Sequence, residues 1–231
     1  MRRVSFVILM LVLLLVPAYA QQLNINRVIV FTGYSYLTTP LIGLNQNGFD
    51  TSFGINANRW LGLGTDFSFF KGSTNLHFPD TTLGTTLAPV VPAAMMPLLS
   101  TLSAPISATT FTWGVGPKVN VRKWSKLTLF AHPGLGLMHE SVDVNLTTLL
   151  ANPVTASIVP LTPLKAHLTD TVPFFGAGVG FDINASRRVG VRFTVDWVRS
   201  HMFNNLLDWQ NNVRFSVGPT WGFGEVYPAK K

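Results

Sequence analysis

Six charged side chains stand at polar positions inside segments that otherwise alternate with large apolar residues. They are Asp66, Lys118, Asp182, Arg192, Asp196 and Arg214. Every second side chain of a strand points to the same face, so all six belong to the polar faces of their segments. Charges enclosed in a narrow interior must pair, or each costs several kcal/mol in desolvation. We interpret the set as a network of ion pairs that plugs an interior, with an ion path or gate as the alternative.

The spacing of these residues predicts two pairs. If the seventh and eighth segments fold back on each other about residue 205, Asp196 and Arg214 face each other directly. If the sixth and seventh segments fold about residue 186, Asp182 and Arg192 lie near each other diagonally. Directly opposed and diagonal side chains on one face of an antiparallel pair are both within reach of long side chains.

One cluster in the chain has the residue types of a hydrolase. His139 and Ser141 share one face of a segment, whereas Glu140 points to the opposite face if the strand is regular. We therefore interpret these residues as surface polarity near a strand end. His132 lies on the polar face, where we expect a hydrogen-bonded interior residue rather than a metal ligand.

Two other chemistries are disfavoured. The segment Gly176-Ala177-Gly178-Val179-Gly180 repeats glycine at every second position, but a dinucleotide loop also needs a following helix. Crowding in a narrow interior explains these glycines. The chain has no cysteine, which excludes thiol catalysis and Cys-ligated metal. We expect no enzymatic activity, no cofactor and no metal.

The elements that position these residues are eight segments with strand periodicity. The last one is the clearest: Asn212, Arg214, Ser216, Gly218, Thr220 and Gly222 alternate with Val213, Phe215, Val217, Pro219, Trp221 and Phe223. A period of two indicates a β-strand. The eight segments are about 27–38, 48–58, 61–71, 109–122, 126–141, 168–184, 189–199 and 212–224. The first has a blurred phase, because residues 28–31 are all apolar.

The connections between these segments differ in length. Three are tight, at 58–60, 122–125 and 184–188, whereas two are much longer, at roughly 72–108 and 142–167. Short turns at one end and long loops at the other are typical of outer-membrane barrels. The long loops are rich in apolar residues over 87–105 and 144–164, and short helices are plausible at about 93–102 and 146–151. We expect these loops either to pack on each other as a cap or to bind a lipid, a hydrophobic ligand or a surface partner.

Composition points to an exported membrane protein. Residues 1–20 combine Arg2 and Arg3, an apolar run and an A-x-A site at Ala18-Tyr19-Ala20, which predicts a secretory signal peptide. Only 12% of residues are charged, about half the usual soluble share. The formal net charge of +7 comes without any Lys/Arg-rich run, so we expect no nucleic-acid binding.

Aromatic residues form two groups that predict two water–lipid interfaces. Near the tight turns are Trp60, Trp124, Phe181, Trp221 and Phe223; near the long loops are Tyr34, Tyr36, Phe49, Phe69, Phe70, Phe111, Trp113, Phe174, Trp197 and Trp209. A water-soluble barrel of lipocalin type is the alternative, but it places apolar residues inside and charge outside. Here the more polar face carries glycines and small residues, which suits a narrow interior.

At this point the chain resembles the small eight-stranded outer-membrane barrels of OmpA type and opacity type, over residues 21–224. Ser216, Gly218, Trp221 and Phe223 match the C-terminal signal that the outer-membrane assembly machinery reads in such proteins. Gly33-Tyr34-Ser35-Tyr36 is similar to their first strand. The resemblance implies a bacterial outer-membrane location, with membrane lipid and the assembly machinery as partners. The tail at 225–231 is too short for a peptidoglycan-binding domain. Lipid A deacylases are also eight-stranded barrels, but the similarity of His139 and Ser141 to them is only a spacing.

The sequence therefore predicts an all-β protein: an eight-stranded antiparallel up-and-down transmembrane β-barrel with two long, partly helical outer loops. Its parts are a signal peptide (1–20), the barrel domain (21–224) and a short tail (225–231). The expected function is a role in envelope structure or surface interaction, through the apolar outer loops and with a plugged lumen. A narrow channel or transporter for small or hydrophobic compounds is the first alternative, and a lipid A-modifying enzyme is the second.

Overall fold

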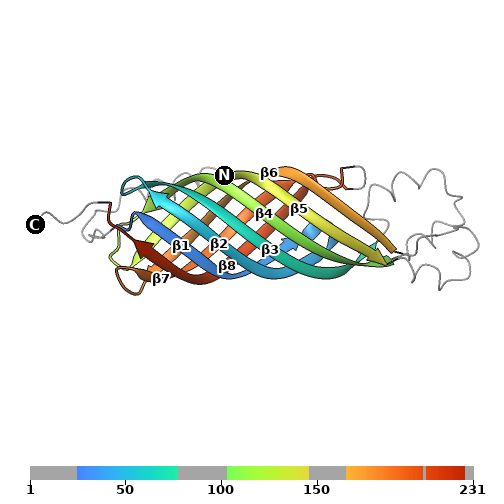
Figure 1. Cartoon of the computed structure of the whole chain (residues 1–231), viewed down its shortest axis with the longest axis horizontal. Helices are drawn as coiled ribbons and strands as arrows, with labels where there is room; N and C mark the ends of the chain where they lie inside the picture. The colour runs from blue at the N-terminus through green and yellow to red at the C-terminus, as the bar shows by residue number, and fades with distance from the viewer. Residues whose placement is uncertain (1–24, 78–102, 146–164, 205–206, 227–231) are drawn as a thin grey trace, which may run out of the picture.

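The chain folds into a closed antiparallel β-barrel in the computed structural model, which describes residues 25–77, 103–145, 165–204 and 207–226 (Figure 1). Its strands are β1 (Val28–Thr39), β2 (Leu44–Asn56), β3 (Leu61–His77), β4 (Ser103–Val121), β5 (Leu127–Asn145), β6 (Lys165–Asn184), β7 (Val189–Ser200) and β8 (Gln210–Phe223). Each strand pairs with the next, and β8 closes the barrel on β1. A short 3-10 helix, η1 (Pro40–Ile42), joins β1 to β2. Within the described ranges, no helix is long and apolar enough to cross a membrane.

The eight-stranded, sequential topology confirms the expectation from the sequence. The connections 57–60, 122–126 and 185–188 are tight and lie at one end of the barrel, which we call the turn end. We call the opposite end the loop end. The expected leader at 1–20, and the expected helices at 93–102 and 146–151, lie outside the described residues.

Strands β3 to β6 exceed their predicted lengths by more than any of the other strands do. β3 to β6 have 17, 19, 19 and 20 residues, whereas the other four have 12 to 14. The ends of the expected loops, 72–77 with 103–108 and 142–145 with 165–167, are therefore strand, and the β1–β2 connection is a four-residue turn. β2 pairs with β3 only as far as Gly72, and β7 pairs with β6 only as far as Phe174. Beyond these points β3 to β6 form a four-stranded sheet that projects from the loop end (Figure 1). Backbone pairing with neighbours stabilises this sheet although its outward face is largely polar.

The strands place apolar side chains outside and polar ones inside. β7 shows this residue by residue: Val191 and Trp197 are 40% and 39% exposed, whereas Arg192 and Asp196 are 5% and 3% exposed. A water-soluble barrel has the reverse arrangement. The outer surface is therefore suited to lipid, and the interior of the barrel, its lumen, holds the charges.

Aromatic side chains gather on the outer surface near both ends. Trp60, Trp124 and Phe223 are exposed near the turn end. Towards the loop end, Phe49 stacks on Phe69 and Phe175 packs edge-on against Trp197. Two members of the expected loop-end group, Phe70 and Phe174, instead point into the lumen and are 0% and 7% exposed. Each is the inward half of a Phe-Phe doublet, because consecutive strand residues face opposite sides.

Candidate functional site

The middle of the lumen is organised around the guanidinium of Arg214. Its Nε donates to Asp196 Oδ2 at 2.9 Å, and its Nη1 donates to Asp66 Oδ2 at 2.9 Å and to Ser68 Oγ at 2.6 Å. Arg214 and Asp196 are directly opposite in the β7–β8 register, as the spacing predicted. Asp66 reaches the cluster from β3, across the lumen. One arginine thus ties β8 to both its neighbour and the opposite wall.

A histidine completes this central charge cluster, which we define as Arg214, Asp196, Asp66 and His132. His132 Nε2 lies 3.1 Å from Asp196 Oδ1, although the alignment is too poor for a hydrogen bond. The backbone opposite His132 is Gly178, and a Cβ there would overlap both the Asp196 carboxylate and the imidazole. The glycine repeat of β6 therefore serves close packing of lumen side chains, as we expected. Among the described residues, no three His, Cys, Asp or Glu side chains gather as a metal site.

A second ion pair lies closer to the turn end. Arg192 donates from Nε to Asp182 Oδ1 at 2.7 Å and from Nη2 to Asp182 Oδ2 at 2.9 Å, and its Nη1 donates to Ser52 Oγ at 3.2 Å. The predicted diagonal relation of this pair is wrong, because the register places Asp182 directly opposite Arg192. Both side chains are about 95% buried, and the bidentate geometry satisfies the carboxylate fully.

Lys118 is the one predicted lumen charge that stands apart from these pairs. Its Nζ lies 3.6 Å from the centroid of the Phe130 ring, and no carboxylate of the described residues lies within 4.0 Å of it. The Arg192 guanidinium also faces Phe130, at 4.8 Å. Nearby, Arg122 follows β4 and donates to Asn56 Oδ1, and burial lowers the pKa of Arg122 to about 10. The turn-end layer of the lumen therefore carries more cations than carboxylates.

The loop-end half of the lumen is filled by apolar side chains, which the strand periodicity does not predict. We call this cluster the apolar plug: Leu37, Phe70, Met138, Phe174, Val198 and Met202. None of its members is more than 7% exposed. Because an eight-stranded barrel is just wide enough for side chains to fill it, the plug closes the lumen at this level.

A second apolar cluster lies under the projecting sheet. It joins Leu44, Ile106, Ala108 and Val142, with Phe203 packed against it. Beside it, the Gln46 amide and Thr110 Oγ1 are within 3.0 Å of each other. The inner face of the projecting sheet is thus apolar where it meets the barrel.

The hydrolase-like residues do not form a catalytic arrangement. His139 Nδ1 and Thr171 Oγ1 are 2.7 Å apart on the outer surface, so the imidazole is engaged with threonine rather than serine. Glu140 is on the lumen face and 7% exposed, as the alternation predicted. No described contact joins the three side chains.

The residues of the predicted assembly signal are divided between two faces of β8. Trp221 and Phe223 are 36% and 53% exposed on the outer surface. Ser216 points inward, with its Oγ 2.8 Å from Ser35 Oγ. Gly218 lies where β8 passes so close to β1 that a Cβ would overlap the Thr32 carbonyl. Whether these four residues act as an assembly signal stays a prediction.

Comparison with known proteins agrees with this geometry. The sequence pattern of the family described as "Outer membrane protein beta-barrel domain" matches residues 6–220. Among solved structures, Neisserial surface protein A is similar with a TM-score of 0.53 at 12% identity, over 85% of this chain and 96% of that one. OprG of Pseudomonas aeruginosa is similar with a TM-score of 0.50 at 9% identity, over 88% of this chain and 99% of that one. At such identities these structures share the fold alone. No curated protein sequence is significantly similar to this chain.

Proposed function

Because the chain belongs to the outer membrane protein beta-barrel domain family and is therefore a bacterial outer-membrane protein, we propose that it acts at the cell surface through its loop end rather than by conducting solutes. Its role is in envelope structure or in contact with an external surface. The lumen serves as a rigid internal support for the strands that carry the contact region.

The filled lumen is the observation that carries this proposal. The apolar plug is almost fully excluded from solvent, and the central charge cluster adjoins it, with Arg214 opposite Leu37 in the β1–β8 register. Any solute passing the barrel would have to displace packed aromatic and methionine side chains and then part buried ion pairs. Both displacements are costly, since large-to-small changes in packed cores and broken buried pairs each amount to several kcal/mol.

The contact region is the projecting sheet of β3 to β6 together with the segments it carries. Its outward-facing residues include Ser107, Asp143, His167 and Thr169, so this part of the sheet is suited to water rather than to lipid tails. The sequence between β3 and β4 contains Val90, Val91, Met95, Met96, Leu98 and Leu99. Apolar residues at the loop end of an outer-membrane barrel suit hydrophobic contact with a lipid or a partner surface.

Adherence of intact cells to hexadecane droplets tests this role. Cells that display the protein should adhere more than cells without it, and a variant with residues 85–100 replaced by a Gly/Ser linker of equal length should lose the increase. The control replaces Arg187 and Arg188 in a tight turn by serine, and should adhere like the native protein. Equal adherence of the native protein and the linker variant, at equal surface amounts, would refute the proposal.

Transport of a small hydrophobic compound is the second candidate. It is favoured by the apolar character of the lumen at the loop end, where a compound without charge would meet the apolar plug first. This function requires the plug to move. Uptake of a hydrophobic fluorophore into liposomes separates the two candidates, because a surface-contact protein gives no uptake above that of empty liposomes.

A further inference from the structure

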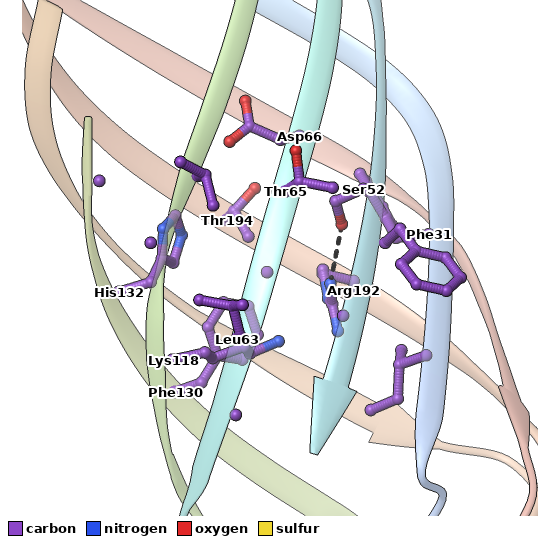
Figure 2. A pocket seen from close by; sticks show the side chains of 18 of the residues that line it. Phe31, Ser52, Leu63, Thr65, Asp66, Lys118, Phe130, His132, Arg192 and Thr194 are labelled. Atoms are coloured by element: carbon purple, nitrogen blue, oxygen red, sulfur yellow. Dashed lines mark hydrogen bonds between the residues drawn. The ribbon is translucent and has the colours of Figure 1, made fainter. Parts of the chain in front are cut away.

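A cavity of about 70 Å³ lies in the lumen between the central charge cluster and the turn end (Figure 2). Figure 2 shows Asp66 at the upper end of this cavity, Lys118 with Phe130 at the lower end, and Arg192 on the opposite wall. A single water needs roughly 10–15 Å³ of such space, so the cavity holds an ion or a small group together with water. Neither the proposed surface role nor the plug requires this space.

Glycines on the lumen face keep the cavity open. Gly54, Gly64 and Gly134 all line it. A Cβ added at any of them would meet nothing nearer than a carbonyl oxygen at 3.7–3.8 Å. These three glycines therefore differ from Gly178, where a Cβ would overlap side chains. Crowding does not account for glycine at these positions, whereas an unfilled cavity does.

The lower end of the cavity has more positive charge than its own carboxylate offsets. Asp182 is fully engaged by Arg192, which leaves Lys118 as an ammonium with only the face of Phe130 beside it. The two cations share this one ring, at 3.6 and 4.8 Å from its centroid. Like charges this close repel, and the low dielectric of a closed lumen strengthens that repulsion. Three carboxylates line the upper end: Asp66 and Asp196 are bonded to Arg214, and Asp50 accepts a hydrogen bond from Ser68 Oγ at 3.3 Å.

An unused hydrogen-bond donor also lines the cavity. Thr194 is 8% exposed, and its Oγ1 has no hydrogen-bond partner among the described residues. Buried hydroxyls are nearly always satisfied, so an isolated one that borders a cavity indicates a missing partner. A hydroxyl, an ammonium and a guanidinium are three donors around one space, and together they favour an acceptor with negative charge.

We propose that the turn-end cavity of the lumen binds a small inorganic anion, of the size of chloride or nitrate, between Lys118, Arg192 and Thr194. The anion offsets the charge of Lys118. The carboxylates at the upper end repel the anion and so confine it to the lower end. This site is independent of the contact region at the loop end, so either proposal can fail without the other.

The probe is chloride itself, observed as the ³⁵Cl NMR linewidth during titration of the folded protein in a zwitterionic detergent. The native protein should give a saturable excess linewidth that nitrate displaces and gluconate, which is too large for the cavity, does not. Lys118→Met should weaken chloride binding at least tenfold, whereas Lys118→Arg should retain it. Lys71→Met is the matched control, because Lys71 is exposed on the outer surface of β3.

A second variant tests the cavity without changing any charge. Gly64→Val fills the space and should abolish the saturable linewidth while the protein keeps the heat-dependent gel shift of a folded barrel. If Lys118→Met fails to fold, Gly64→Val still tests whether the cavity binds chloride. The proposal is overturned if the native protein shows no saturable component, or if Gly64→Val binds chloride as well as the native protein does.

Discussion

Removal of Arg214 should destabilise the barrel strongly. Arg214→Ala leaves Asp196, which is 3% exposed, without its direct partner and also strips Asp66 of its bond from across the lumen. Breaking one buried pair in this way typically costs about 3–5 kcal/mol. Because every 1.4 kcal/mol is tenfold, we expect the folded fraction relative to the unfolded one to fall roughly 100- to 5,000-fold.

A neutral replacement of Arg214 together with its two carboxylate partners should cost less than this single change. The triple variant Asp66→Asn, Asp196→Asn and Arg214→Gln keeps polar side chains at all three positions but leaves none of them charged. A variant that neutralises only Asp196 and Arg214 is a poorer comparison, because it leaves Asp66 without its guanidinium partner. Uncompensated charge, rather than lost volume, is thus the main expected source of the Arg214→Ala penalty.

Urea unfolding in phospholipid liposomes, followed by tryptophan fluorescence and by heat-dependent gel mobility, measures these differences. Arg188→Ala is the control, since Arg188 is exposed in the β6–β7 turn, and it should unfold like the native protein. Unfolding of Arg214→Ala at the same urea concentration as Arg188→Ala would contradict this prediction. A triple variant less stable than Arg214→Ala would contradict it as well.

Three further predictions concern topology, assembly and packing. We expect the tight turns to face the periplasm, so single cysteines at positions 93 and 187 should label on intact cells only at 93; labelling only at 187 would show the opposite orientation. Trp221→Ala or Phe223→Ala should lower the amount of heat-modifiable protein in the outer membrane, and unchanged amounts in both variants would contradict a role in assembly. Gly178→Ala should destabilise by about 1–3 kcal/mol in urea unfolding because its Cβ overlaps Asp196 and His132, whereas Gly64→Ala should be tolerated. Equal effects of these two changes would show that the lumen relaxes around an added methyl group.

The strand periodicity was sufficient to predict the barrel because every hairpin shows the same alternation of polar and apolar residues. A face that alternates every second residue marks a strand, and a tight turn sets the register of its partner. This logic gave the Asp196–Arg214 pair correctly. It failed for Asp182 and Arg192 by a single position, because the β6–β7 hairpin is centred on residue 187, with Asn184 opposite Gly190.

The apolar plug could not be recognised from periodicity alone. Phe69-Phe70 and Phe174-Phe175 each place one ring outside and one inside. From the sequence alone, both rings of each doublet look like members of the outer aromatic group. Leu37, Met138 and Met202 are brought to the same level only by the barrel closure, which no local pattern encodes. The direction of Phe70 was nevertheless predictable in principle, because it shares the face of Asp66 and Ser68 along β3.

The projecting sheet was missed for a different reason. Residues 72–77 contain Gly72, Ser73, Thr74 and Asn75, which lack the outward apolar residues that identify a lipid-facing strand. Outside the lipid zone a strand needs no apolar outer face, because backbone pairing with its neighbours is enough to hold it. Hydrophobic alternation therefore reports the membrane-facing part of each strand and underestimates its length.

Planar-bilayer recording of the purified native protein tests most directly the claim that the barrel is closed and acts through its surface. The apolar plug and the ion pairs beneath it predict a bilayer that stays at baseline conductance, without stepwise openings, at moderate voltage and salt. Reproducible single-channel steps from the folded, native protein would contradict the account and would make the transporter function the leading one.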